Sequence, residues 1–197
     1  MKAREWERYL QAQRQQHGKV LFTITELAHV SGSSRNVLNV ELNRLCRQGI
    51  AVRYDHGLYG LPDAAGPEEL VQLMDSRAYI TASYALLLHG IIAQVPARIT
   101  CFTNRRSPRA RVRQTPVGQI EFVCIRSRVY NLPPDQPIAP SFQALCDFVY
   151  LARRQGVDLA RQVTFRNLDQ ISGVLPTELL ERYPSTVRDA VTHLFSP

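Results

Sequence analysis

Four polar residues at helical spacing have the chemistry to contact nucleic-acid bases: Asn36, Asn39, Asn43 and Arg47. In the major groove of DNA an asparagine amide can form two hydrogen bonds with adenine, and an arginine guanidinium can form two with guanine. Asparagine is a poor helix former, so three asparagines on one exposed helix face need another reason to be there. The spacing therefore indicates DNA contact, and an ordinary polar helix face is the alternative.

A helix-turn-helix would position these residues. Residues 23–26 (Thr-Ile-Thr-Glu) fit a capping box that begins a short helix, which ends near Val30. Gly32 then favours a tight turn, and Ser33 is predicted to cap a second helix that extends through Gln48. A short helix, a turn with glycine and a longer helix are the order typical of a helix-turn-helix.

The apolar residues support the same arrangement. The predicted second helix has Leu38, Leu42 and Leu45 at a spacing that forms one buried stripe, opposite the polar face. An amphipathic helix is also predicted over residues 4–16, with Trp6 on its buried side. The polar face that could bind DNA would thus be fixed by the core behind it.

A β-hairpin is predicted directly after the second helix. Two short apolar runs flank a turn at residues 55–57, where Gly57 can supply a positive φ. Arg53 and His56 lie where the tip of such a wing would meet phosphates or the minor groove. The order of helices and hairpin predicts a winged helix-turn-helix domain over residues 1–62.

A mixed α/β domain with a small sheet is predicted for residues 68–197, after a short linker at residues 63–67. Residues 98–103 and 119–125 have the alternation and composition of strands. Helices are predicted over residues 68–76, 79–89 and 141–154, and a last helix carries Val187, Ala190, Val191 and Leu194. The fold class of the whole chain is therefore expected to be α+β.

An arginine-rich segment lies between the two predicted strands, at residues 104–113. Its five arginines are candidate contacts for a polyanion: Arg105, Arg106, Arg109, Arg111 and Arg113. Such a loop could neutralise phosphates of DNA or of an RNA-like substrate. The alternative is a solvated hairpin loop whose charge only aids solubility.

The charge of the 197-residue chain is unevenly distributed. The formal net charge of +7 is the sum of +4 over residues 1–62, −3 over 63–97, +7 over 98–130 and −1 over 131–197. Two basic regions separated by an acidic segment are typical of a protein that faces a polyanion in two places. Solvated surface charge is the simpler alternative.

Several enzyme classes are excluded by the scarcity of lysine, which occurs only at Lys2 and Lys19. No P-loop and no Ser-x-x-Lys pair is present. His89 lies where a helix C-terminus favours a histidine, and Asp147 has no second carboxylate at a spacing useful for acid–base catalysis. We therefore expect no catalytic residue and no enzymatic activity.

The cysteines and histidines do not have the spacing of a metal site. None of the four cysteines forms a C-x-x-C pair, and the five histidines are scattered. We expect no metal and no cofactor, and reduced, mostly buried cysteines. No apolar run approaches the roughly 18 residues of a membrane span, and the N-terminus lacks the apolar region of a signal peptide. The expected location is cytoplasmic, with no membrane partner.

Three segments together resemble the antitoxins of the AbiE type IV toxin–antitoxin and abortive-infection systems. The first is the predicted winged helix from Phe22 to Pro62. The second, residues 82–90, is similar to the Ala-Leu-x-x-His-Gly element of that family. The third, residues 138–147, is similar to its Ile-Ala-x-Pro-x-x-Ala-Leu-x-Asp element, although Pro140 and Ser141 stand in the reverse order.

The resemblance implies a winged-helix autorepressor joined to an antitoxin domain at residues 68–197. Such proteins bind inverted repeats in their own promoter and counteract a nucleotidyltransferase-like toxin without needing a stable complex with it. The partners implied are double-stranded DNA and that toxin. The implied DNA contacts include Ser34 and Arg35, so the full candidate set is Ser34, Arg35, Asn36, Asn39, Asn43, Arg47, Arg53 and His56. His89 and Asp147 are expected to be structural.

Two other functions stay open from the sequence. One is a nucleic-acid-processing enzyme that grips its substrate with the basic loop at residues 104–113. The other is a ligand-sensing winged-helix transcription factor without a toxin partner.

Overall fold

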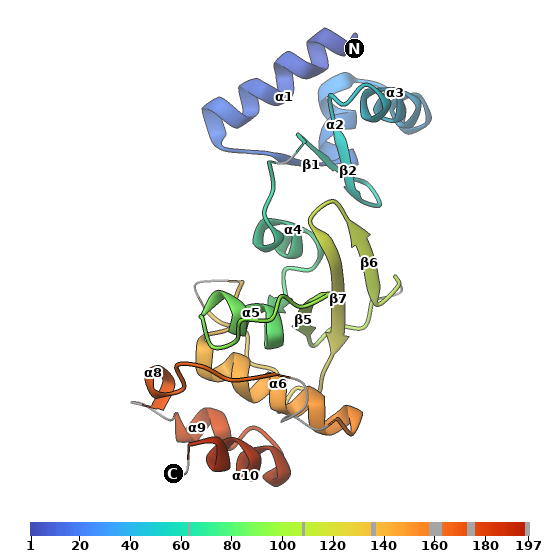
Figure 1. Ribbon diagram of the computed structural model, residues 1–197. Coiled ribbons are helices and arrows are strands. Elements are labelled where there is room, and N and C mark those ends of the chain that lie inside the picture. Colours follow the sequence, from blue (N-terminus) through green and yellow to red (C-terminus); the bar gives the residue numbers. More distant parts are fainter. Residues whose placement is uncertain (63, 108, 135–136, 158–162, 173–175, 196–197) are drawn as a thin grey trace. The chain divides into compact units, whose positions relative to one another are not determined.

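The structure is a computed structural model that describes residues 1–197 except 63, 108, 135–136, 158–162, 173–175 and 196–197. The described chain forms two compact units, whose elements are labelled in Figure 1. The first unit contains Met1–Leu70 and Arg113–Gly118, and the second contains Val71–Val112 and Gln119–Pro197. Of the predicted linker at residues 63–67, residue 63 lies outside the described residues and the rest belongs to the first unit.

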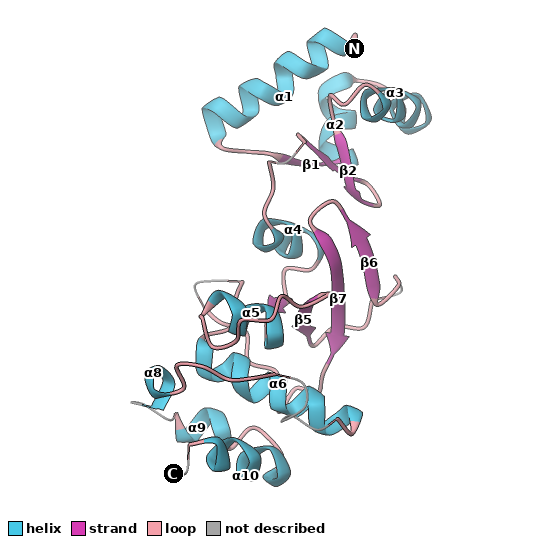
Figure 2. Cartoon of the chain, viewed as in Figure 1, coloured by secondary structure: helices cyan, strands magenta, loops and turns pink. Residues whose placement is uncertain are grey.

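The first unit combines helices with a small antiparallel sheet (Figure 2). Its elements in chain order are α1 (Ala3–His17), β1 (Leu21–Thr23), α2 (Ile24–Ser31), α3 (Arg35–Arg47), β2 (Val52–Asp55) and β3 (Leu58–Gly60). The sheet has the strand order β1-β3-β2, so the strand that precedes α2 pairs with the second strand of the hairpin. This pairing ties both ends of the α2–α3 segment to one sheet.

The predicted capping box at the start of α2 is confirmed. The backbone N–H of Glu26 donates to Thr23 Oγ1 at 3.3 Å, and the backbone N–H of Thr23 donates to the Glu26 carboxylate at 2.8 Å. Gly32 ends the helix in the left-handed conformation, with φ of 63°. Glycine adopts this conformation without steric cost, which explains the sharp turn at this position.

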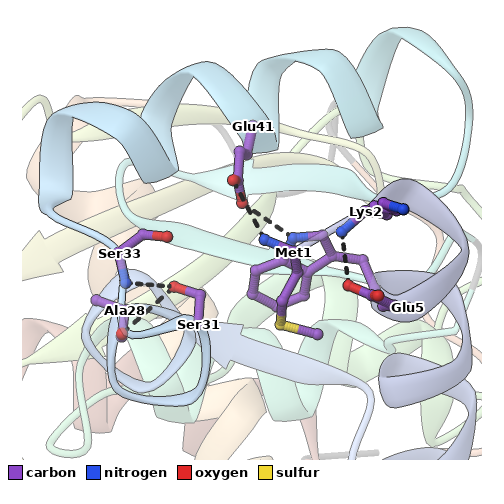
Figure 3. A network of polar contacts seen from close by, with 8 residues as sticks. Met1, Lys2, Glu5, Ala28, Ser31, Ser33 and Glu41 are labelled. Atoms are coloured by element: carbon purple, nitrogen blue, oxygen red, sulfur yellow. Dashed lines mark hydrogen bonds and ion pairs between the residues drawn. The ribbon is translucent and has the colours of Figure 1, made fainter.

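The N-terminus of α3 differs from the expectation in one respect. Ser34, not Ser33, is the N-cap residue, and the helix begins at Arg35. Ser33 belongs to the turn, because its backbone N–H donates to the Ser31 hydroxyl at 3.2 Å, as Figure 3 shows. The Ser34 side chain makes no capping hydrogen bond, which leaves its hydroxyl available on an exposed residue.

The core of the first unit lies between α1, α2, α3 and the sheet. Leu38, Leu42 and Leu45 form the expected stripe on α3 and are at most 1% exposed. Trp6 is fully buried in the same cluster. Burial of a leucine or a larger apolar side chain contributes roughly 1.5–3 kcal/mol, so this stripe fixes which side of α3 faces solvent.

The hairpin is confirmed, with a shorter turn than expected. Asp55 was predicted to lie in the turn but is the last residue of β2, paired with Leu58 across His56 and Gly57. Gly57 has a φ of 74°, as a tight hairpin turn requires. The buried Tyr54 hydroxyl donates to the backbone carbonyl of Leu61 at 2.8 Å and fixes the base of the hairpin.

A second, mixed sheet has the strand order β4-β5-β7-β6 and lies in the second unit except for Arg113–Thr115 of β6 and Gly118 of β7, which belong to the first unit. Its strands are β4 (Tyr79–Ile80), β5 (Ile99–Thr103), β6 (Val112–Thr115) and β7 (Gly118–Cys124). The strands β5 and β7 match the two predicted ones, and they pair in parallel from Ile99↔Ile120 to Thr103↔Cys124. The parallel pairing brings the carboxyl ends of β5 and β7 to one edge of the sheet.

Two sequence predictions in the second unit were wrong. Tyr79 and Ile80 were assigned to a helix but form β4, because they pair with Phe102 and Cys101 of the neighbouring strand. The arginine-rich segment was assigned entirely to a loop, but its last two residues lie in β6. Residue 108 of that segment lies outside the described residues.

Helices pack on this sheet and on each other. They are α4 (Pro67–Met74), which spans the division between the units, α5 (Ala82–Leu88), α6 (Ser141–Gln155), α8 (Asp169–Ser172), α9 (Thr177–Leu180) and α10 (Ser185–Leu194). The long helix α6 packs against α5 and α10. The helix predicted over residues 141–154 is confirmed, and it is buried on all sides over residues 142–149, with exposed residues only near its C-terminal end.

Candidate nucleic-acid interface

One side of α3 is a continuous exposed surface of polar side chains. Every candidate contact of this region is exposed: Ser34, Arg35, Asn36, Asn39, Asn43 and Arg47. Val40 lies among them with 71% of its surface exposed. The leucine stripe of α3 faces the core on the opposite side from Asn36, Asn39, Asn43 and Arg47. Ser34 and Arg35 are exposed at the N-terminal end of the helix, nearer the side of the leucine stripe. These six exposed residues are here called the α3 face.

The amides on the α3 face have no structural task within the unit. The side chains of Asn36, Asn39 and Asn43 form no hydrogen bond with another described residue. Each costs the helix up to roughly 0.7 kcal/mol relative to alanine. Amides held on a rigid helix without partners are suited to donate and accept hydrogen bonds with an external group.

The side of α3 away from the α3 face is anchored to the N-terminus of α1. The carboxylate of Glu41 accepts a hydrogen bond from Trp6 Nε1 at 3.1 Å and one from the Met1 amino group at 3.4 Å. Figure 3 shows the Glu41 side chain pointing from α3 toward Met1. A charged acceptor on a buried indole holds the helix at a defined rotation, because a rotated helix would leave the indole N–H without its partner.

The two candidate residues of the hairpin lie next to each other at its tip. Arg53 and His56 are both exposed, and Arg53 Nη2 lies 3.1 Å from His56 Nδ1. Arginine can only donate, so Nδ1 is the acceptor and the imidazole proton is on Nε2. Arg53 Nε also donates to the Asp55 carbonyl at 3.3 Å, which orients the guanidinium along the turn.

The five arginines of the basic segment do not share one environment. Arg105, Arg106 and Arg109 are exposed in the loop after β5. Arg111 pairs with Glu121 of the adjacent strand at 2.8 Å. Arg113 lies in β6, is only 8% exposed, and pairs with Asp55 at 3.2 Å within the first unit. Arg113 therefore forms an ion pair inside the protein. An arginine in a solvated loop would instead be expected to face solvent.

A hollow lined with arginines lies in the second unit. It has a volume of about 620 Å³ and is lined by Arg106, Cys124, Ile125, Arg126, Ser127, Tyr150 and Arg154. A second hollow of about 310 Å³ adjoins it and shares Arg106, Cys124 and Arg154. Arg126 and Arg154 were not among the candidate residues. They are distant in sequence from the basic segment. Only the parallel pairing of β5 and β7, which aligns the carboxyl ends of the two strands, could have indicated them.

His89 and Asp147 have structural surroundings. His89 Nε2 lies 2.8 Å from the carbonyl oxygen of Ala139, next to the C-terminal end of α5. Asp147 is fully buried and accepts hydrogen bonds of 2.7 Å from the hydroxyls of Thr81 and Tyr183. Burial raises the pKa of Asp147 to about 7, although the hydrogen bonds from Tyr183 and Thr81 act in the opposite direction. The two hydrogen bonds of Asp147 join α6 to Thr81, the N-cap residue of α5, and to Tyr183, which precedes α10.

The cysteines are less uniformly buried than expected. Cys101 and Cys146 are buried and Cys46 is half-buried, but Cys124 is exposed at the end of β7. Its side chain is in the arginine-lined hollow described above, which makes it a useful chemical reporter of that site.

The part of the chain that the structure describes holds neither a cluster of metal ligands nor a membrane-spanning helix. No group of three or more histidine, cysteine or acidic side chains lies together there as metal ligands would. No helix within the same residues has the length and apolar character needed to cross a membrane.

Comparison with protein-family models and with curated proteins found no match for this chain. The assignment of a function therefore rests on the residues and the geometry described above.

Proposed function

We propose that this protein is a DNA-binding transcriptional autorepressor and antitoxin, of the kind found in AbiE type IV toxin–antitoxin operons. Its N-terminal unit is a winged helix-turn-helix in which α2 and α3 form the helix pair and the β2–β3 hairpin forms the wing. α3 enters the major groove, and the hairpin contacts the adjacent backbone. The DNA target is an inverted repeat in the protein's own promoter.

The observation that carries the proposal is the α3 face. It presents three amides and two guanidiniums that are exposed, at helical spacing, on a helix whose opposite side is anchored in the core. Asn39 and Asn43 lie one turn apart, a spacing that lets neighbouring side chains reach neighbouring base pairs. Val40 beside them can contact the methyl group of a thymine.

The connectivity of the first unit supports the same proposal. A helix, a strand, two helices and a hairpin follow one another, and the first strand completes the hairpin's sheet in the order β1-β3-β2. This order places the hairpin directly after the helix that would bind the groove. Arg53, oriented along the turn by the Asp55 carbonyl, is then available to a phosphate oxygen.

The antitoxin role rests on the resemblance of the Ala82–Gly90 and Ile138–Asp147 segments to that family. Most apolar residues of both segments lie in or against the core of the second unit, with Leu88 the exception at 50% exposed, in agreement with the expected structural role of these motifs. The partner opposed by this unit is a nucleotidyltransferase-like toxin. We assign no catalysis to the protein itself.

The DNA part of the proposal is tested by a gel-shift titration on the duplex immediately upstream of the protein's own gene, with an unrelated duplex as competitor. Wild type should shift the upstream duplex specifically. Asn39→Ala and Asn43→Ala should each weaken binding by roughly 1–3 kcal/mol, the typical cost of one lost base contact. Both variants should fold at least as well as wild type, since alanine is the better helix former.

Gln48→Ala is the matched control for these variants. It also removes an exposed amide at α3, but the position lies about 140° around the helix from Asn43, at about 100° per residue. Its operator affinity should equal that of wild type. Undiminished binding by a doubly substituted Asn39→Ala/Asn43→Ala protein would contradict the assignment of the α3 face.

The antitoxin part needs a separate experiment. The toxin gene adjacent to the protein's own gene is expressed together with wild type or with the Asn39→Ala/Asn43→Ala variant. The variant should still restore growth, because the neutralising unit is distinct from the DNA-binding unit. Failure of wild type to restore growth would remove the antitoxin role and leave the repressor.

A ligand-responsive transcription factor is the second candidate, and the arginine-lined hollow of the second unit favours it. A factor of this kind would bind the same operator, but its affinity for the operator would fall or rise when a ligand occupies the hollow. Operator titrations with and without added nucleoside triphosphates distinguish the two candidates.

A further inference from the structure

The arginine-lined hollow lies where the carboxyl ends of two parallel strands meet. Thr103 at the end of β5 is paired with Cys124 at the end of β7, and the backbone N–H of Ile125 extends this pairing by donating to the Thr103 carbonyl at 2.9 Å. The residues that follow both strands must therefore lie at one sheet edge. In α/β proteins, ligands bind preferentially outside the carboxyl ends of parallel strands.

Three arginines from three different parts of the second unit line the hollow. Arg106 follows β5, Arg126 follows β7, and Arg154 lies in the last turn of α6. All three are exposed, and their guanidiniums have no ion pair or hydrogen bond with another described residue. No described acidic residue lines either hollow. Mutual repulsion among these cations would be relieved by a bound anion.

The remaining walls of the hollow are aromatic and polar. Tyr150 of α6 is half-buried, and its ring is held edge-on by Phe102 and Tyr183 at centroid distances of 6.2 and 6.3 Å. Ser127 adds a hydroxyl at the rim, and Ile125 adds an apolar surface. A volume of about 620 Å³ is within the range of small-molecule sites. An aromatic wall beside several arginines suits a base together with its phosphates.

We propose that this hollow is a binding site for a phosphorylated nucleotide, with Arg106, Arg126 and Arg154 on the phosphates and Tyr150 beside the base. The nucleotide is either a free nucleoside triphosphate or the phosphorylated end of a single RNA strand, which share this chemistry. The site lies wholly within the second unit and is independent of the DNA-binding face on α3. Arg105 and Arg109 at the adjoining hollow extend the positive surface along the phosphate chain.

The thiol of Cys124 provides a direct test with the full-length protein. The rate of its alkylation by iodoacetamide is measured by mass spectrometry, with the half-buried Cys46 of the first unit as an internal reference. The probes are each nucleoside triphosphate, inorganic tripolyphosphate, and a short single-stranded RNA with or without a terminal phosphate. A nucleoside triphosphate should protect Cys124 at a concentration about tenfold lower than tripolyphosphate does, because stacking of the base adds to the phosphate contacts.

Variants distinguish binding in this hollow from a general attraction of anions to the positive charge of the protein. Arg106→Ala and Arg154→Ala should each weaken protection about tenfold, the effect of one lost charge-assisted contact. Arg153→Ala removes the same charge from the neighbouring exposed position of α6, which does not line the hollow, and should change protection less than twofold. Thermal unfolding of each variant verifies that it is folded.

Each outcome bears on the proposal. Protection by a free triphosphate, or protection by the RNA only when it carries the terminal phosphate, supports it and identifies the source of the nucleotide. Absence of protection by all probes overturns it, as does equal weakening by Arg153→Ala and Arg154→Ala. The variant Asn39→Ala/Asn43→Ala should be protected like wild type, so failure of the DNA-binding proposal would not affect this result.

Discussion

The indole N–H of Trp6 donates to the carboxylate of Glu41 at 3.1 Å, which connects the first turns of α1 to the middle of α3. Trp6 is fully buried, and the Glu41 side chain is 18% exposed. A hydrogen bond to a charged acceptor at such a site is stronger than one between neutral groups. The contact lies away from the α3 face, so it can set the rotation of α3 without occupying the surface that would meet DNA.

A double-mutant cycle with Trp6→Phe and Glu41→Ala should reveal this coupling. We expect a coupling free energy of about 1–2 kcal/mol in urea unfolding, because each single variant removes the same bond. Glu41→Gln, which retains an oxygen acceptor, should lose much less stability than Glu41→Ala. Strictly additive losses in the cycle would show that the hydrogen bond does not stabilise the unit.

The buried carboxyl of Asp147 should make stability depend on pH. Burial raises its pKa in the folded protein to about 7, whereas an unfolded aspartate titrates near 4. Between these values the folded state binds the proton more strongly, so the contribution of Asp147 to stability is fully present below about pH 4 and is lost as the pH rises through about 7. The expected slope is at most about 1.4 kcal/mol per pH unit. Urea unfolding at a series of pH values measures it.

Asp147→Asn should abolish most of that slope, because the amide does not titrate. The hydroxyl of Tyr183 and the thiol of Cys146 stay protonated in this range, since burial raises the pKa of both groups further from neutrality. Asp189→Asn, which changes an exposed carboxylate of α10, should retain the wild-type slope. A wild-type slope in the Asp147→Asn protein would exclude Asp147 as its source.

Thr23 and Ser34, the N-cap residues of α2 and α3, should contribute very differently to the free energy of unfolding. Thr23→Ala removes a formed capping bond and should cost about 1 kcal/mol in the free energy of unfolding. Ser34→Ala, at the N-cap position of α3, should cost almost nothing because its hydroxyl makes no capping bond. Thermal unfolding of the two variants gives the comparison. A loss in Ser34→Ala equal to that in Thr23→Ala would mean that the hydroxyl caps α3 in solution.

Most of the first unit could be predicted from local sequence. The capping box at Thr23, the turn at Gly32 and the leucine stripe on α3 each act within a few residues, and each has a distinct pattern. Ser33 and Ser34 show the limit of this reasoning. Two adjacent serines are equally good caps in sequence, and only the hydrogen bond from the Ser33 N–H to Ser31 selects between them.

The second unit was less predictable because its decisive contacts are distant in sequence. Tyr79 and Ile80 fit a helix by composition, but pairing with β5 makes them a strand. The segment around Arg113 is equally ambiguous, since its charge suggests a loop while its place in the sheet makes it part of β6. The arginine-lined hollow depends on the parallel pairing of Thr103 with Cys124. Without that pairing, nothing in the sequence connects Arg106 with Arg126 and Arg154.

The salt dependence of operator binding tests the proposed contact between the hairpin and a DNA phosphate. Each phosphate neutralised by a basic side chain contributes about −0.9 to the slope of log K against log salt concentration on duplex DNA. Arg53 is exposed at the hairpin tip, and its guanidinium is oriented by the Asp55 carbonyl and His56. Arg53→Ala should therefore reduce the magnitude of the slope by about 0.9, and should weaken binding to all duplex sequences alike.

Asn39→Ala should show the opposite pattern of affinity and salt dependence. Operator binding of both variants is measured by fluorescence-anisotropy titrations. An amide that contacts a base carries no charge, so its loss should lower the affinity for the operator and leave the salt slope unchanged. Discrimination between the operator and an unrelated duplex should fall in Asn39→Ala and persist in Arg53→Ala. If Arg53→Ala kept the wild-type slope, the hairpin would not contact the backbone and α3 alone would remain as the DNA-binding element.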